Sequence, residues 1–116
     1  LSLQGQVDMM ILENPEGIQG WTEPRAQRFV EKNARIPVGS AHQWLAPYSL
    51  ITIAKIPEEQ GWWAAEQAIK ILNGTRPSDI PETHNKQGKL IANMSMANLL
   101  GITLSSELLQ TATIIK

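Results

Sequence analysis

Apolar residues occur along the chain in short runs separated by longer segments with helical spacing. The short runs cover 7–12, 36–39, 50–54 and 90–92. Runs of this length are typical of strands rather than helices, and the β-branched residues of 50–54 favour the same interpretation. We therefore expect at least four short strands, with a polar and aromatic loop over 40–49 between the second and the third.

Two longer segments have the signals of helices. In 23–33 and 57–74, apolar residues recur at helical spacing and a Pro lies in the first turn, where its missing N–H costs nothing. Thr22 is placed to cap the first helix, and Gly74 to end the second. The second segment is apolar on nearly two faces, so we expect it to be packed on more than one side.

The carboxyl-terminal quarter predicts further short elements. Asn93 is suited to cap a helix over 94–100, which Gly101 would end. Another turn or helix is expected near Ser105, and 113–115 is either a terminal strand or a packed tail. Alternating strands and helices predict an α/β fold, with three αβα layers around a mostly parallel sheet.

Length and composition exclude several classes of protein. The chain has 116 residues, the size of one small domain, and its 10 basic and 11 acidic residues leave a net charge of −1. This balance gives no basic surface for nucleic acid, and the apolar content is too high for a disordered chain. There is no Cys, so disulfides, thiolate metal sites and a cysteine nucleophile are excluded.

Motifs for catalysis or metal binding are absent. His42 and His84 are far apart and neither has a second ligand at helical spacing. The segment 16–20 lacks a phosphate-loop pattern, and 38–42 lacks the second Gly of a hydrolase elbow. Glu58 and Glu59 are adjacent at a predicted helix start, where carboxylates usually complement the helix dipole. We therefore expect no catalytic residue, no metal and no cofactor.

A binding site is better supported than a catalytic one. In open α/β sheets, ligands bind beyond the carboxyl ends of the strands, and the loops in that position are 13–21 and 40–48. These loops combine flat aromatic faces with hydrogen-bonding tips, which suits a polar organic ligand. The candidate ligand-binding residues are Asn14, Trp21, His42, Gln43, Trp44 and Tyr48. An ordinary surface loop with aromatic residues at its rim remains an equal alternative.

The second half resembles a known family. The run 58–65, the helix end and proline-containing linker 68–81, and the Asn93-capped segment ending in Leu-Gly-Ile at 100–102 are similar to the carboxyl-terminal part of ABC-transporter substrate-binding proteins with the type I periplasmic-binding fold. The first half is compatible with the same family.

The resemblance implies that a larger protein surrounds these residues. Family members have two α/β lobes joined by three chain crossings. Residues 1–116 would be a carboxyl-terminal part comprising strands and a helix of a partial second lobe (1–56), a helix packing toward the first lobe (57–74), and a crossing linker with terminal helices (75–116). A fragment of this kind would arise by proteolysis or design, or its chains would associate as a homo-oligomer to cover apolar surface.

The implied function is that of the solute-binding component of an ABC-type uptake transporter. It would capture a small molecule between two lobes and present it to the transporter permease. The parent protein would work outside the cytoplasmic membrane, in a periplasmic or lipid-anchored form. Two alternatives stay open: a ligand-sensing extracellular domain of a membrane signalling protein, and a small α/β enzyme using Ser40 and His42.

Overall fold

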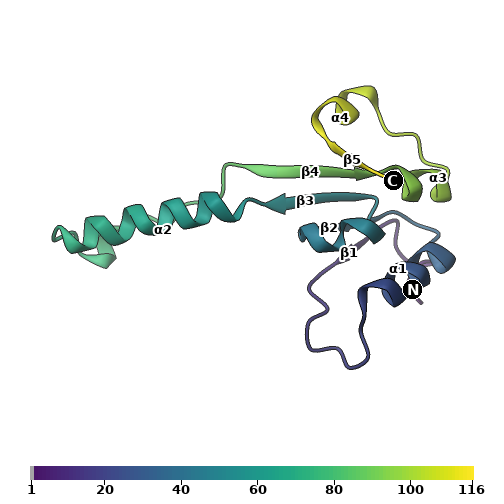
Figure 1. The fold of residues 1–116 in the computed structure, drawn as a ribbon, viewed down its shortest axis with the longest axis horizontal. Helices are drawn as coiled ribbons and strands as arrows, with labels where there is room; N and C mark the ends of the chain where they lie inside the picture. The colour runs from purple at the N-terminus through teal and green to yellow at the C-terminus, as the bar shows by residue number, and fades with distance from the viewer. Residues whose placement is uncertain (1) are drawn as a thin grey trace. The chain divides into compact units, whose positions relative to one another are not determined.

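The computed structural model describes residues 2–116. These residues divide into two compact units: Lys55–Gly88 form the smaller one, and the residues before and after this segment form the larger one. Figure 1 shows the chain with its helices and strands labelled.

The larger unit is built on a five-stranded sheet. Its strands lie in the order β1-β2-β3-β4-β5, and β3 and β4 each end or begin at the boundary with the smaller unit. β1 and β2 are parallel to each other, as are β2 and β3, and β4 and β5, whereas the arrows of β3 and β4 run in opposite directions (Figure 1). The strands are β1 Met10–Leu12, β2 Val38–Ser40, β3 Ile51–Lys55, β4 Gly88–Asn93 and β5 Thr113–Ile115. The predicted α/β class with a mostly parallel sheet is confirmed.

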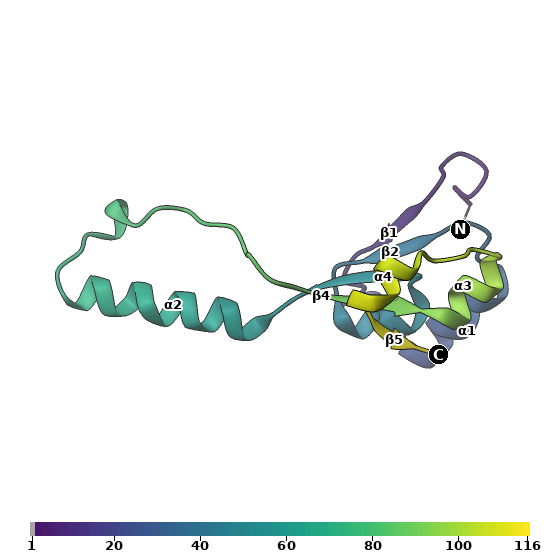
Figure 2. The same ribbon diagram turned by 90° about the horizontal axis from the view of Figure 1, so that it is seen from above.

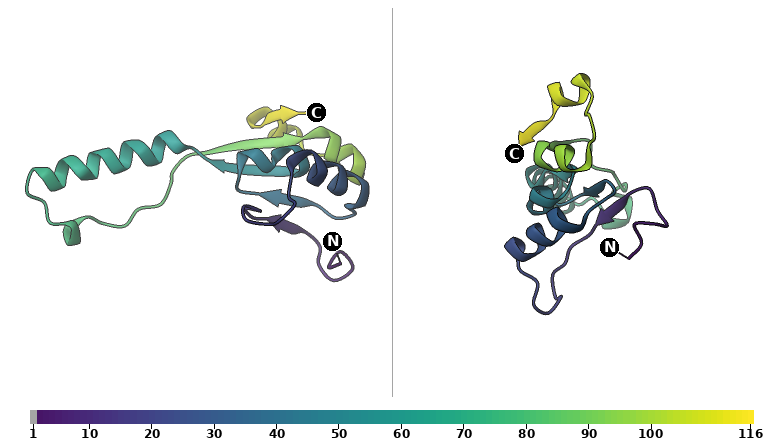
Figure 3. Two further views of the ribbon diagram at one scale, coloured as in Figure 1. Left: turned by 60° about the horizontal axis from the view of Figure 1, so that its bottom comes forward. Right: turned by 90° about the vertical axis from the view of Figure 1, so that its right-hand side faces the viewer.

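Helices flank this sheet and supply most of its core. They are α1 Glu23–Asn33, the 3-10 helix η1 Gln43–Tyr48, α3 Met94–Leu100 and α4 Ser106–Thr111. α1, η1 and α3 share one hydrophobic cluster, whose buried members are Ala26, Val30, Ala34, Leu45, Tyr48, Leu50, Met96 and Ala97. Figure 3 shows the ribbon in two further views. The apolar residues of α1, η1 and α3 therefore face a common interior.

Local signals explain where these helices begin and end. α3 begins where Asn93 Oδ1 accepts the backbone N–H of Met96, and it ends at Gly101, whose φ of 66° is left-handed and suits Gly best. α4 begins in the same way, with Ser105 Oγ accepting the N–H of Leu108. Caps that the sequence predicted thus fix both boundaries of α3.

Two expectations from the sequence need correction. The first strand covers only Met10–Leu12 rather than 7–12, and the predicted loop over 40–49 contains η1. η1 forms because Leu45, Ala46 and Tyr48 turn inward to the core, and this burial depends on contacts that are distant in sequence. The open choice for 113–115 is resolved as strand β5.

The smaller unit contains one long helix and a returning segment. α2 covers Pro57–Leu72 and is followed by the short 3-10 helix η2, Pro77–Asp79. The chain then runs without helix or strand over 81–87 until β4 begins (Figure 2). Gln67 is the buried side chain of α2, whereas Trp62 and Leu72 are 78% and 85% exposed. The predicted packing of α2 on more than one side is therefore not seen within residues 2–116.

Candidate functional site

The carboxyl ends of β1 and β2 form the edge where the sequence predicts a binding site. The parallel register places Leu12 opposite Ser40, so the loops that follow these strands start side by side. Ser40 Oγ donates to the carbonyl oxygen of Leu12 at 3.0 Å and accepts the backbone N–H of His42 at 3.1 Å. One hydroxyl therefore fixes where the second loop leaves the sheet.

His42 connects both loops at this edge. Its Nε2 lies 3.5 Å from the carboxylate of Glu13, and its ring stacks on Trp44 with centroids 4.5 Å apart and planes at 30°. Trp44 is 49% exposed, so one indole surface remains available next to a carboxylate and an imidazole. Flat apolar surface beside hydrogen-bonding groups is the usual lining of a site for a polar organic molecule.

Asn14 and Gln43 lie at the exposed margin of this edge. The side-chain oxygen of Asn14 accepts the backbone N–H of Glu16, and the side-chain nitrogen of Asn14 donates to the Glu16 carboxylate, both at 3.0 Å. This turn orders the start of the first loop. Gln43 is exposed at the first position of η1.

Trp21 and Tyr48 face the core of the larger unit instead. Their rings meet edge to face, with centroids 6.3 Å apart, and Tyr48 is only 1% exposed. Within residues 2–116, the Tyr48 hydroxyl makes no hydrogen bond. Burial raises the pKa of Tyr48, and the carboxylate of Glu23 adds to the rise.

The structure thus brings together part of the predicted set. His42 and Trp44 form one cluster with Glu13, which the sequence analysis did not select, although it directly follows the first strand. Trp21 lines a separate open hollow of about 290 Å³ together with Ile18 and Phe29. A ligand-binding role for the six predicted residues stays a prediction.

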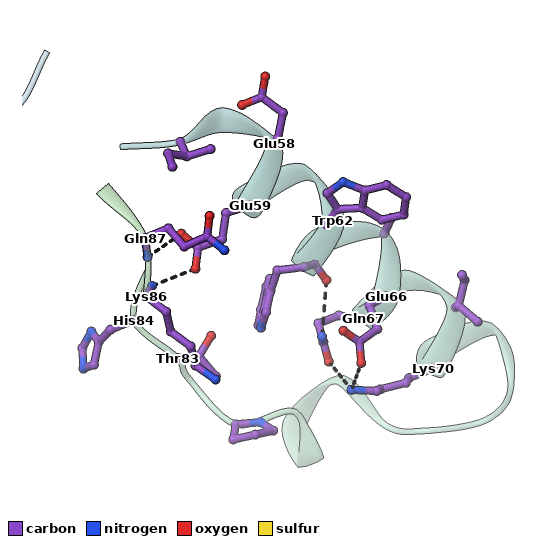
Figure 4. A pocket seen from close by; sticks show the side chains of 15 residues that line it. Glu58, Glu59, Trp62, Glu66, Gln67, Lys70, Thr83, His84, Lys86 and Gln87 are labelled. Carbon is purple, nitrogen blue, oxygen red and sulfur yellow. Dashed lines mark hydrogen bonds and ion pairs between the residues drawn. The ribbon is translucent and has the colours of Figure 1, made fainter. Parts of the chain in front are cut away.

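A larger groove lies within the smaller unit. It has a volume of about 850 Å³ and runs between α2 and the returning segment. Its lining includes Trp62, Trp63, Glu59 and Lys70 (Figure 4). Lys70 pairs with Glu66 at 3.1 Å, so part of the charge along the groove is neutralised.

Neither a metal-binding cluster nor a membrane-spanning helix is found within residues 2–116. There, no three His, Cys, Asp or Glu side chains lie together in a way that could hold a metal ion. None of the helices in this range has both the length and the apolar character to cross a membrane.

The fold is that of an α/β lobe, and in open sheets of this class ligands bind beyond the carboxyl ends of parallel strands. The sequence shows the family: residues 13–116 match the family described as ABC transporter substrate binding protein. The chain belongs to this family, and the expected relationship is confirmed. No curated protein matches the chain.

Solved structures with a similar fold agree with this assignment. A substrate binding protein with adhesive properties from Clostridium difficile, in its ligand-free, open form, is 25% identical with a TM-score of 0.67. A conserved domain protein from Vibrio cholerae is 19% identical with a TM-score of 0.66. The ABC domain from Streptococcus pneumonia in complex with L-Trp is 19% identical with a TM-score of 0.67.

All three structures are much longer than this chain. Each alignment covers 99% of this chain, but only 38% or 39% of the solved one. The chain therefore spans about two fifths of their length, in agreement with the expectation that it corresponds to part of a substrate-binding protein.

Proposed function

We propose that these residues form part of the solute-binding component of an ABC-type uptake transporter, which captures a small molecule between two lobes. The observation that carries the proposal is the cluster of His42, Trp44 and Glu13 at the carboxyl edge of parallel strands, in a chain of the substrate-binding family. Binding needs no covalent step. A ligand that contacts both lobes stabilises the closed form simply by binding it more tightly than the open form.

The edge also adjoins the point where the chain leaves the sheet. β3 is parallel to β2 and ends at Lys55, so its carboxyl end lies at the same edge of the sheet as the candidate loops. We assign residues 1–56 to the second lobe, 57–74 to a helix that packs on a first lobe, and 75–116 to the crossing linker and terminal helices. The exposed apolar side chains of α2, such as Trp62 and Leu72, support a covering lobe.

Partners and location follow from the proposed role. The small-molecule ligand would be delivered to the permease of an ABC transporter by the full-length parent protein. Such a protein would work in the periplasm or another extracytoplasmic space, where a lipid anchor would hold it near the permease. Without a first lobe, two chains would associate through the apolar face of α2.

The test uses the full-length parent protein. It is purified gently, and mass spectrometry identifies any co-purified small molecule. Thermal-shift screening then tests amino acids, including the L-Trp found in one similar structure, and sugars. A ligand at about 100 times its dissociation constant should stabilise the protein by roughly 2.7 kcal/mol.

A matched pair of variants locates the binding site. Trp44→Ala should weaken binding of the identified solute at least tenfold, or about 1.4 kcal/mol, because it removes the exposed indole face. Leu99→Ala is the control, since Leu99 is 48% exposed and Trp44 is 49% exposed, but Leu99 lies on α3. Failure of every solute to bind would contradict the proposed function, whereas unchanged affinity of Trp44→Ala would contradict only the proposed site.

A further inference from the structure

Glu59 holds the returning segment of the smaller unit against the first turn of α2. One carboxylate oxygen accepts the backbone N–H of Lys86 at 2.7 Å, and the other accepts that of Gln87 at 3.1 Å (Figure 4). Hydrogen bonds to an ionised carboxylate are stronger than those between neutral groups. The neighbouring Glu58 is exposed and thus provides a comparison on the same helical turn.

This contact lies where the chain leaves and re-enters the sheet. Glu59 follows the end of β3 at Lys55, and Gln87 immediately precedes the start of β4 at Gly88. β3 and β4 are hydrogen-bonded neighbours in the sheet, joined by bonds such as Asn93 N–H to the Leu50 carbonyl at 3.0 Å. We call the chain that follows β3 the outgoing connection and the chain that precedes β4 the returning connection. The two are therefore linked twice, once by the pairing of β3 with β4 and once by the hydrogen bonds of Glu59.

The returning segment makes few other hydrogen bonds within residues 2–116. Within residues 2–116, the hydrogen bonds that reach 81–87 are the two from Lys86 and Gln87 to Glu59, and this stretch forms neither helix nor strand. Loss of the Glu59 carboxylate would free these two amides, because no strand pairing replaces it at 86–87. One side chain thus supplies the hydrogen bonds that hold 86–87 against the first turn of α2.

We propose that Glu59 is a positioning residue that makes the outgoing and returning connections move as one body. The functional importance of this role rests on the proposed function. If a solute moves the lobes, the two connections would move together rather than independently. Its structural basis requires no ligand.

Amide hydrogen exchange of the 116-residue chain, measured by NMR without ligand, tests the proposal. In Glu59→Ala, the amides of Lys86 and Gln87 should exchange at least tenfold faster after correction for intrinsic rates. Glu59→Gln should also accelerate them, since a neutral amide has one oxygen acceptor in place of two charged ones. Glu58→Ala is the matched control and should leave both rates unchanged.

A second readout separates this role from general loss of stability. The Asn93 amide, which bonds to the Leu50 carbonyl in the sheet, should keep its rate in all three variants. Unchanged rates at Lys86 and Gln87 in Glu59→Ala would overturn the proposal, and so would an equal acceleration at Asn93. Because no solute is present, either result is independent of whether the parent protein binds one.

Discussion

Asn93 offers the sharpest test of how the larger unit is held together. The side chain is 3% exposed. Its oxygen caps α3 at the N–H of Met96, and its amide nitrogen donates to the carbonyl oxygens of Ala46 at 3.1 Å and Pro47 at 2.9 Å. One residue at the end of β4 therefore joins the start of α3 to the end of η1, beside the core.

The expected cost of Asn93→Ala follows from these three hydrogen bonds. Loss of a helix cap costs about 1 kcal/mol, and a buried polar group left without its partner costs about 1–3 kcal/mol. Both carbonyls belong to one short turn and can relax together, so we count them as one unpaired group and expect a total of about 2–4 kcal/mol. This is a large part of the roughly 5–15 kcal/mol that stabilises a typical domain.

Urea denaturation followed by tryptophan fluorescence and far-UV circular dichroism measures this cost. Asn93→Asp distinguishes the two roles, because aspartate still caps α3 but places a carboxylate against two carbonyl oxygens. It should be at least as unstable as Asn93→Ala. Asn98→Ala, an exposed substitution on α3, should change the free energy of unfolding by no more than about 0.5 kcal/mol. Wild-type stability of Asn93→Asp, or a cost below about 1 kcal/mol for Asn93→Ala, would refute the reasoning.

Two further predictions concern a buried hydroxyl and an exposed face. The raised pKa of Tyr48 means that its stabilising contribution is complete below the unfolded pKa near 10 and falls as pH rises. Tyr48→Phe also removes a hydroxyl that has no partner within residues 2–116. In urea titrations, the variant should match or exceed wild-type stability at pH 7 and should lose less stability than the wild type between pH 9 and 11. A decrease of more than about 1 kcal/mol in the free energy of unfolding at pH 7 would contradict this prediction. If chains associate through α2, light scattering after size exclusion should show oligomers for the wild type and monomers for Leu72→Glu. The substitution should change the free energy of unfolding by about 0.5 kcal/mol or less. A monomeric wild type would disprove the association.

The elements with strong local signals could be predicted from the sequence. Helices over 23–33 and 94–100 have the bounds that the structure shows, because Pro, Asn and Gly act through the local backbone. The 3-10 helix η1 lacked such a signal. Its turn depends on the burial of Leu45 and Tyr48 against α1 and α3, and spacing along the chain does not reveal which distant partners will cover a side chain.

The candidate site shows the same division between local and distant information. The rule for strand ends selected the correct loops for a common edge, so His42 and Trp44 lie together. The same rule does not predict the orientation of each aromatic ring. Trp21 and Tyr48 are aromatic residues of the same two loops, yet Tyr48 is buried and Trp21 packs edge to face against it. The strand-end rule places the backbone of a loop but does not determine which way a side chain turns.

α2 shows that apolar spacing can predict a helix correctly without revealing which surface covers it. The apolar spacing predicted the helix with its start at Pro57, and the same pattern requires a surface that would bury Trp62 and Leu72. Within residues 2–116, the helix buries Gln67 instead and leaves these large apolar side chains exposed. Hydrophobic periodicity predicts that one face of a helix is covered by an apolar surface. It does not show whether that surface belongs to the same 116 residues. The exposed apolar face of α2 is therefore the observation that best supports our proposal of a covering lobe or a second chain.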